Sequence, residues 1–477
     1  MTLHTVGSAM ILALGLCTCA VAQSASTVPA RQPLTYKDSG IYGWWQPYFW
    51  EGPFDYVIAQ AIILPGDFTG SEGTNNATDL EHIKIWNESL MKTRAAGKRV
   101  LVVVSPGQGR PYSDEYFAAL ERFLANINHE ELYAISLGEE NISAADWVAA
   151  LTDGYHRIKK QYPDLPIYQF YSCSSRAEAR PGFEWPLLPS DGWLSDEYVA
   201  TPDDFEQAIR RYRMLGKPFV NIIWAAPFYS SSRQTSVPYH QSIFDGQLRV
   251  SEKYNIPTAY FCWDGPIGRF WSWHEQGQQE NKDVFKLILD SVARAKTLPD
   301  TKLNDWDDAG KPVPTVLSKD GDNAFSYRES YDLWTGLPGS APPPAEDFMS
   351  RSQIRGLRHM TCPQDPSRIV VSAAGEKPVD AGITNHWVAP EGQSLNFNAS
   401  VNVIVEPGSN VEVILDVSPN GYDWAARATT KESGTLTVDL PEAHAEMYTR
   451  LRVTGTAAAG KPLAAIDWIE VRGEAAQ

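Results

Sequence analysis

The chain has 477 residues, which is too long for one ordinary domain and allows two or three domains, or one barrel with an accessory domain. Its residues are 43% hydrophobic and 21% charged, so a sizeable core is available and global disorder is excluded. The 41 Lys and Arg against 58 Asp and Glu give a net charge of −17, which repels phosphate backbones and anionic lipid. We therefore expect a monomer that has neither a nucleic-acid nor a membrane partner.

The first 22 residues have the pattern of a signal peptide. Ala9 to Leu16 form an apolar run that is shorter than the roughly 20 residues of a membrane-spanning helix. Ala20-Val21-Ala22 then has the small-x-small form of a cleavage site, so we expect a secreted or periplasmic protein. Leu16 to Cys19 could alternatively be a poor lipidation box. The cysteines that remain are too widely spaced for a disulfide framework or a zinc site, so no metal and no cofactor are expected: Cys173, Cys262 and Cys362.

Residues 23–300 alternate short apolar runs with amphipathic helical patterns, which predicts an α/β domain. Eight strands with crossover helices over some 250 residues fit a (β/α)8 TIM barrel better than an open, doubly wound sheet. No Gly-rich nucleotide-binding loop follows any strand. The predicted strands are 40–48, 56–64, 99–105, 132–137, 167–173, 192–198, 219–224 and 258–263, and the predicted helices are 79–96, 113–128, 144–161, 202–215, 240–254 and 281–296.

The remaining sequence changes character twice. Residues 301–365 contain Pro342-Pro343-Pro344 and read as an irregular linker that packs on the barrel. Residues 366–477 show alternating runs separated by turn signals such as Asn420-Gly421, which predicts a C-terminal β-sandwich. Trp387, Tyr422 and Trp424 of this sandwich are candidates for glycan contact, although packing or docking to the barrel would also explain them.

The fourth predicted strand aims an acid at the mouth of the barrel. Active sites of such barrels lie at the C-terminal ends of the strands. Ala134, Ser136 and Gly138 alternate with large residues, so the period of two places them, and Glu140 after them, on the inner side. Glu139 points outward by the same alternation unless a bulge reverses it.

A glutamate that ends strand four beside an asparagine, here Glu140-Asn141, resembles the acid/base position of the secreted (β/α)8 glycoside hydrolases. The resemblance covers the architecture and this short motif. It implies a glycosidase whose general acid/base is Glu140. These enzymes usually carry a nucleophilic glutamate at the end of strand seven, whereas strand seven here, 219–224, ends without a carboxylate.

A second carboxylate must then come from another strand, because glycoside hydrolysis needs one carboxyl on each side of the bond. Asp264 follows strand eight, and Asp196 and Glu197 end strand six. If Leu194 faces the helices, Glu197 faces the mouth. Glu139 beside Glu140 also allows a substrate-assisted arrangement. A lone acid at a strand end is equally often a helix cap or a salt-bridge partner, so the set matters more than any member.

Sixteen tryptophans exceed what cores usually need, and amphipathic rings suit the faces of sugars. Basic residues are scarce at the strand ends, which favours a neutral poly- or oligosaccharide. We expect a secreted glycosidase that uses a carboxylate pair; the alternative is a non-catalytic glycan-binding barrel. The expected stacking platforms are Trp45, Trp193, Trp224 and Trp263, and the expected hydroxyl-binding residues are Gln60, Gln169 and Asn221.

Overall fold

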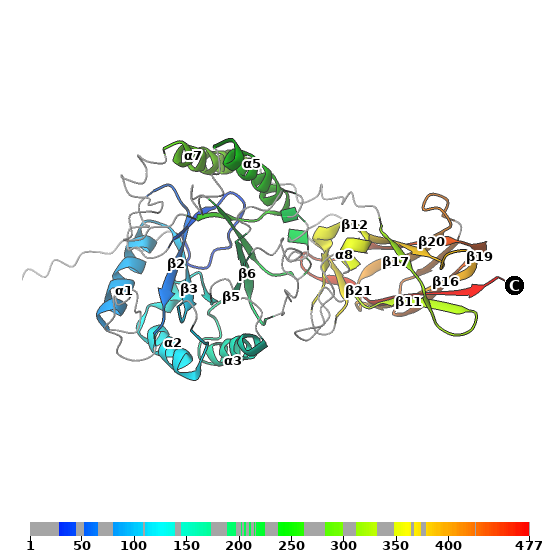
Figure 1. Cartoon of the computed structure of the whole chain (residues 1–477), viewed down its shortest axis with the longest axis horizontal. Helices are drawn as coiled ribbons and strands as arrows, with labels where there is room; N and C mark the ends of the chain where they lie inside the picture. The colour runs from blue at the N-terminus through cyan, green and yellow to red at the C-terminus, as the bar shows by residue number, and fades with distance from the viewer. Residues whose placement is uncertain are drawn as a thin grey trace, which may run out of the picture.

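The computed structural model contains a barrel and a C-terminal β domain (Figure 1). It describes residues 28–43, 52–64, 80–107, 110–138, 145–172, 188–196, 202, 205–206, 209–210, 214, 216–224, 237–261, 282–298, 312–331, 348–363, 367–373, 378–424 and 426–476.

Eight parallel strands close into a barrel, as the sequence predicts, because β8 pairs back onto β1. Helices surround the strands in Figure 1. The strands are β1 (Ser39–Gly43), β2 (Tyr56–Ile62), β3 (Arg99–Ser105), β4 (Ala134–Leu137), β5 (Ile167–Ser172), β6 (Gly192–Asp196), β7 (Phe219–Trp224) and β8 (Thr258–Phe261). The helices are α1 (Leu80–Ala95), α2 (Asp114–Asn126), α3 (Ala145–Gln161), α5 (Val237–Tyr254) and α7 (Lys282–Thr297), with a short 3-10 turn η2 (His129–Glu131).

Helix α2 shows why these segments are helical. The Ser113 hydroxyl accepts a hydrogen bond from the Tyr116 amide at 3.3 Å, which satisfies one of the free N–H groups of the first turn. Asp114 and Glu115 occupy that turn, where the helix dipole favours negative charge. The helix then buries one apolar stripe against the barrel: Tyr116, Phe117, Ala119, Leu120, Phe123 and Leu124.

Large and small residues on neighbouring strands fill the inside of the barrel. Gly40 pairs with Tyr56 and Gly192 pairs with Tyr168 across the parallel ladders. A Cβ at Gly40 would lie 2.2 Å from the Tyr56 ring, and one at Gly192 would lie 2.5 Å from the Tyr168 ring. Each glycine therefore provides the space that the adjacent tyrosine occupies.

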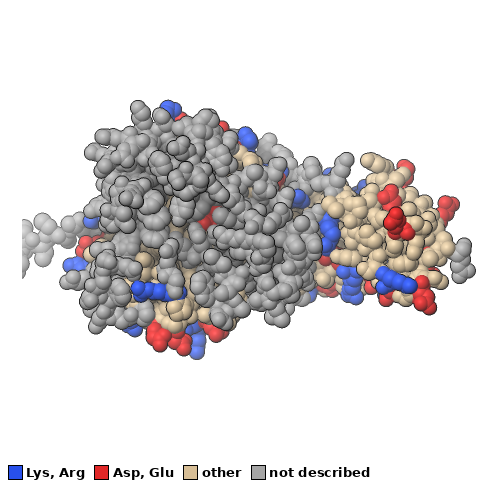
Figure 2. All heavy atoms as spheres, in the orientation of Figure 1, with Lys and Arg blue, Asp and Glu red and all other residues tan. Residues whose placement is uncertain are grey.

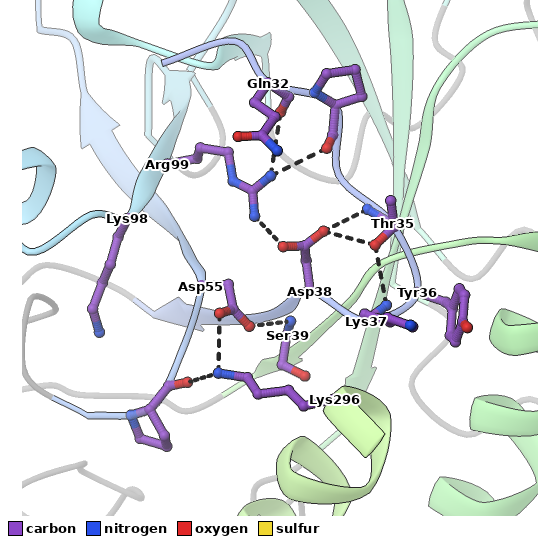
Figure 3. A network of polar contacts seen from close by, with 12 residues as sticks. Gln32, Thr35, Tyr36, Lys37, Asp38, Ser39, Asp55, Lys98, Arg99 and Lys296 are labelled. Carbon is purple, nitrogen blue, oxygen red and sulfur yellow. Dashed lines mark hydrogen bonds and ion pairs between the residues drawn. The ribbon is translucent and has the colours of Figure 1, made fainter. Parts of the chain in front are cut away.

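A network of polar contacts fastens the N-terminal segment across the bottom of the barrel, where β1 and β3 begin (Figure 3). Asp38 forms an ion pair with Arg99 and accepts hydrogen bonds from both the amide and the hydroxyl of Thr35. Arg99 also donates to the backbone carbonyls of Gln32 and Pro33 at 3.3 and 3.2 Å. The buried guanidinium thus ties residues 32–38 to β3.

Replacing Arg99 with methionine should lower the free energy of unfolding by about 3 kcal/mol, because Asp38 would keep a partly buried charge without its partner. Urea unfolding followed by circular dichroism measures the change. Lys286→Met is the matched control: its pair with Asp290 on α7 is exposed and should be worth less than about 0.5 kcal/mol. Equal effects of the two substitutions would contradict the role of the network.

Lys98 lies beside this network, and its burial makes the charged form of the side chain less favourable. Its ammonium group donates to the Gly52 carbonyl at 2.8 Å. The pKa of Lys98 is lowered to about 8, mainly by burial; Asp55 partly opposes the shift, and the nearby Lys296 contributes to it. Between pH 8 and about 10.5, where a lysine titrates in the unfolded chain, the unfolded state therefore binds more protons than the folded state.

Stability contributed at Lys98 should consequently rise with pH through this window. Compared with Lys98→Met, the wild-type protein should gain about 1–2 kcal/mol between pH 7.5 and pH 10. Urea midpoints of both proteins at the two pH values measure the difference, in which the titration of other groups cancels. A difference that is constant with pH, or that falls, would show that the Lys98 pKa is not lowered.

The C-terminal part is a β-sandwich of two antiparallel sheets, as the sequence predicts, with one parallel edge strand, β9. One sheet holds β10 (Ser318–Lys319), β11 (Ala324–Glu329), β13 (Met360–Thr361), β14 (Ile369–Ser372), β16 (Leu395–Val405), β19 (Gly434–His444) and β21 (Pro462–Ala475). The other holds β9 (Pro314–Val316), β12 (Gln353–Arg355), β15 (Val379–Val388), β17 (Asn410–Ser418), β18 (Ala426–Thr430) and β20 (Glu446–Thr456). Helix α8 (Phe348–Arg351) and the 3-10 turn η5 (Leu357–His359) flank β12.

The prediction of an irregular linker over residues 301–365 needs correction. In the part that the structure describes, this segment supplies five strands of the sandwich, β9 to β13. These strands have only two to six residues, so they carry too little alternation to be recognised and form only because longer strands pair with them. β11 pairs with β21, and β9 pairs with β15.

The β domain is docked on the barrel. The Cys362 amide donates to the Met214 carbonyl, and a Cβ at Gly216 would lie 2.9 Å from the Thr361 methyl group. Buried residues of the two parts belong to one continuous apolar cluster. Trp387 lies within it, only 1% exposed, and its indole N–H donates to the Thr449 hydroxyl at 2.9 Å. Trp387 therefore packs the sandwich and is unavailable to a glycan.

A chain that ends after Ser340 should aggregate, because it keeps β9 to β11 but loses their partners β15 and β21. Leu317, Phe325 and Tyr331, which are buried in the full chain, would be exposed. A chain that ends after Leu298 removes these strands as well and should give less aggregate. Size-exclusion chromatography compares the two. A folded monomer for the longer version would show that these strands are stable without the sandwich.

Candidate active site at the C-terminal face of the barrel

The inside of the barrel changes from apolar to polar along the strands. Tyr42 packs against Phe170 and Phe261 in the interior, with ring centroids 5.7 and 5.3 Å apart. Polar side chains then occupy inner positions toward the C-terminal ends, and each is at most 5% exposed: Gln60 of β2, Ser105 of β3, Ser136 of β4 and Asp196 of β6. This is the end at which barrels of this type bind substrates.

Two of these polar groups contact each other. The Gln60 amide donates to the Ser105 hydroxyl at 3.4 Å, which links β2 to β3. The same hydroxyl lies 3.4 Å from the Gly107 amide, where the chain leaves β3. Gln60 thus lies inside the barrel, as the prediction of a substrate-binding role requires. Ser105 was not singled out from the sequence, although it ends a strand with the inner parity of Leu101 and Val103.

Strand four has the predicted orientation. Ile135 and Leu137 belong to the apolar cluster under the helices, whereas Ala134, between them in the alternation, does not. The strand ends at Leu137, and Gly138 has a positive φ of 81° that takes the backbone out of the extended region. Glu139 and Glu140 lie outside the described residues. Because alternation stops at Gly138, both glutamates stay candidates for the acid that faces the mouth.

Strand six has the opposite orientation to the one that would favour Glu197. Gly192 faces the interior, because a Cβ there would lie 2.5 Å from the Tyr168 ring, and Leu194 shares its side by alternation. Trp193 belongs to the apolar cluster under the helices. By alternation, Asp196 shares the inner side with Leu194. Glu197 lies outside the described residues. Asp196 is therefore the one predicted catalytic acid whose position the structure describes, and it is fully buried at the C-terminal end of β6.

A second aspartate, Asp191, lies at the opposite end of β6 and has a structural role. Asp191 directly precedes β6 and accepts hydrogen bonds from the Ile167 amide at 2.9 Å and the Tyr155 hydroxyl at 3.1 Å. It also pairs with Lys159 at 3.1 Å. Asp191 thus ties β5, β6 and α3 together at the stable N-terminal end of the barrel. Asp196 lies at the other end of the barrel, the face at which barrels of this type place their catalytic residues.

Strand eight carries its polar groups toward the helices. The Thr258 hydroxyl is 3.0 Å from that of Ser251 on α5. Burial raises the pKa of Tyr260, and a hydrogen bond with Ser291 on α7 partly opposes this. Alternation along the sequence of strand eight groups Asp264 with Thr258 and Tyr260, and these two described residues face outward. Asp264 itself lies outside the described residues, and its role as the second acid stays a prediction.

Three of the residues expected to bind substrate instead serve the interface between strands and helices. Asn221 is fully buried and donates to the Gln247 side chain of α5 at 3.1 Å. Gln169 is fully buried and donates to the Pro189 carbonyl at 3.3 Å. Trp193 is 1% exposed, with Lys217 over its ring at 5.3 Å. This corrects the expectation that they line the mouth, which assumed that only apolar side chains face the helices.

The remaining predicted platforms are not placed by the structure. Trp45 and Trp263 lie outside the described residues, and so does the side chain of Trp224, which ends β7. Within the described ranges, no group of three or more His, Cys, Asp and Glu side chains is arranged to hold a metal ion. The helices described here also include none that is long and apolar enough to span a bilayer.

The sequence matches no model of a known protein family and no curated protein. Among solved structures, the chain is similar to a GH113 β-1,4-mannanase, at 13% identity over 56% of this chain and 100% of that chain, with a TM-score of 0.38. It is similar to a putative α-L-fucosidase from Bacteroides thetaiotaomicron, at 13% identity over 94% and 99% of the two chains, with a TM-score of 0.32. The catalytic domain of a chitinase from Pyrococcus furiosus gives 10% identity over 57% and 99%, with a TM-score of 0.35.

These neighbours are glycosidases by name. The barrel predicted from the sequence is shown by the structure itself, in which eight parallel strands close. A function for this chain must therefore be argued from its own residues.

Asp196→Asn should reduce turnover at least about a hundredfold while the unfolding midpoint changes little, if Asp196 is the second carboxylate. Asp191→Asn, just before the same strand, is the matched control: it should lower the midpoint, because it weakens the contacts with Lys159 and Tyr155, and it should leave turnover unchanged. Release of reducing ends from a glycan panel and thermal unfolding measure the two effects. Normal turnover of Asp196→Asn would eliminate this acid as the partner.

Proposed function

We propose that the protein is a secreted glycoside hydrolase that cleaves a poly- or oligosaccharide with a pair of carboxyl groups. The observation that carries the proposal is the C-terminal end of the closed barrel interior, where Gln60, Ser105, Ser136 and the buried carboxyl of Asp196 succeed an aromatic layer. A fully buried carboxylate is costly in a core and is typical of a functional site at this end of the fold.

In the proposed reaction, Glu140 is the general acid and base. Its carboxyl gives a proton to the oxygen of the leaving sugar while the bond to the anomeric carbon breaks. The second carboxylate either attacks that carbon and forms a glycosyl-enzyme ester, which water then hydrolyses with overall retention, or it activates a water molecule for direct attack, which gives inversion. Asp196 is the partner that the described residues favour, and Asp264 and Glu197 are its alternatives. Strands four and six lie two apart around the barrel, so a sugar ring fits between acids at their ends.

Glu139 enters the proposal in two ways. If the backbone turns at Gly138 so that Glu139 faces the mouth, it replaces Glu140 as the acid. If both face the mouth, Glu139 can orient an N-acetyl group of the substrate, in the substrate-assisted manner. The proposed platforms Trp45, Trp224 and Trp263 would stack on sugar rings, and Gln60 would bind a hydroxyl group near the centre of the site.

The second candidate function is a glycan-binding protein without catalysis. The observation that favours it is β7, whose sequence Phe-Val-Asn-Ile-Ile-Trp ends without the carboxylate that related barrels use as nucleophile. Such a protein would bind the same glycans and release no sugar. We also propose export to the periplasm or the medium, which the pattern of residues 1–22 supports.

Glu140→Gln should lose at least about a hundredfold in rate with the fold retained, because the amide cannot donate the proton. Glu139→Gln is the adjacent control and should keep most of the activity. Reducing-end release from mannan, galactan, chitin and cellulose oligosaccharides measures the rates. The reverse pattern would move the acid to Glu139, and near-normal rates for both variants would overturn the mechanism. A wild-type protein that binds a member of this panel without releasing sugar would establish the non-catalytic alternative.

A further inference from the structure

The turn after β17 is held rigidly by its own side chains. The Ser418 hydroxyl accepts hydrogen bonds from the amides of Asn420 at 3.3 Å and Gly421 at 2.9 Å. The Asn420 side chain accepts from the amides of Tyr422 and Asp423 at 2.9 and 2.8 Å and donates to the Asp423 carboxylate at 2.8 Å. Such turns, in which an asparagine side chain replaces backbone partners, fix the conformation of a loop.

The sheet beneath supports the turn. Gly421 has a φ of 77°, and a Cβ there would lie 3.2 Å from the Tyr448 ring, so the backbone of the turn rests on that ring. Tyr448 in turn packs on His386: the two rings are stacked, with centroids 4.1 Å apart and an interplanar angle of 9°. Tyr448 and His386 are therefore packing groups that hold the turn in place.

Tyr422 is 85% exposed on this ordered turn, and it is the most exposed of the large hydrophobic side chains in the described part of the chain. A single exposed aromatic residue needs no explanation on a flexible loop. Here, however, the backbone carrying the ring is already fixed, so a ligand that stacks on the ring meets a smaller entropic cost. An aromatic face presented in this way suits the apolar face of a sugar ring.

Polar groups beside the turn are also fixed in orientation. Asp416, fully buried on β17, pairs with Arg427 at 2.6 Å and with Arg450 at 2.9 Å. The Arg450 guanidinium lies 4.0 Å from the Trp424 ring, which holds it flat against the sheet. Arg427 is more exposed, and a guanidinium has five N–H donors, so it can donate to a sugar hydroxyl while bound to Asp416.

The charges of this face favour a neutral ligand. Three arginines, Arg427, Arg450 and Arg452, are balanced by the carboxylates of Asp416, Asp423 and Glu446. In Figure 2, acidic and basic side chains are likewise mixed over the visible face of the β domain. A second copy of the chain is a poor occupant, because the net charge of −17 makes two copies repel each other.

We infer that the β domain binds a neutral polysaccharide at a site made of Tyr422 as the stacking platform and Arg427 as a hydroxyl donor. This deepens the proposed function and rests on it only in taking the ligand to be a glycan. The site would hold the polymer on the docked β domain while the barrel acts on it, which raises the effective substrate concentration.

The test is affinity electrophoresis of the full chain in gels that contain galactomannan, β-1,4-galactan, glycol chitin or hydroxyethyl cellulose. Glu140→Gln is present in every protein so that the polymers stay intact. We expect retardation by at least one polymer. Tyr422→Ala should weaken it about tenfold, and Tyr422→Phe, which keeps the ring, should weaken it less than about twofold. Ile404→Ala, at an exposed apolar position on the other sheet, is the control and should not change it.

Retardation that Tyr422→Ala leaves unchanged, or the absence of retardation by all four polymers, would overturn the inference. So would sedimentation that shows a dimer of the parent chain and a monomer of Tyr422→Ala, because Tyr422 would then contact a second copy. Retardation needs no turnover. The hydrolase proposal can therefore fail in the reducing-end assay while this site stands, and this site can fail while the barrel hydrolyses short oligosaccharides.

Discussion

Closure of the barrel between β1 and β8 is the constraint on which the rest of the structure depends. Closure removes the edges of the sheet, but it also creates an interior that must be filled without voids. At the N-terminal end, Tyr56 and Tyr168 fill it by occupying the space beside Gly40 and Gly192. Polar side chains are tolerated only toward the other end, so the packing of the barrel determines where a site can form.

Buried charged residues also differ between the two ends of the barrel. Asp191 and Arg99 lie where strands begin, and each is surrounded by partners that connect separate segments of the chain. Asp416 in the β domain is likewise enclosed by arginines. These charges stabilise the fold because they are paired and hydrogen-bonded. Asp196 is also buried, but it lies at the C-terminal end of its strand, which is the end at which barrels of this type bind substrates.

Much of the architecture was predictable, because the period of two and the spacing of helices and strands are local properties of sequence. All eight barrel strands and the sandwich follow from them. Orientation was harder to predict. Leu194 is apolar whether it faces the helices or the interior, so its type does not determine the parity of β6, and the side of Asp196 had to come from the structure. The strands β9 to β13 were missed because they are short and because three of them pair with distant strands: β9 and β12 with β15, and β11 with β21.

The polar helix-facing side of β7 and β8 explains the other errors. Asn221, a polar residue in a buried strand, was expected to bind a sugar hydroxyl, and Thr258 is a similar residue of β8. Each has instead a polar partner on α5, Gln247 and Ser251, and such pairs leave no sign in one sequence because the partners are separated by a loop and part of a helix. A polar residue inside a strand therefore indicates a site only when its parity is known.

The tryptophans show that composition alone also fails to identify a binding site. Their number suggested sugar platforms, yet Trp193 and Trp387 are core residues whose rings pack and whose exposure is 1%. A ring is suited to bind sugar where one of its faces meets solvent and the backbone that carries it is fixed. Neither condition can be read from the number of aromatic residues in a sequence. Tyr422 meets both, through the Asn420 turn and the Tyr448 ring beneath it. Among the described aromatic residues, Tyr422 is thus the best-defined platform, and the β domain that carries it is fixed to the barrel by the contact between Met214 and Cys362. A polymer bound there, as we propose, would stay close to the barrel.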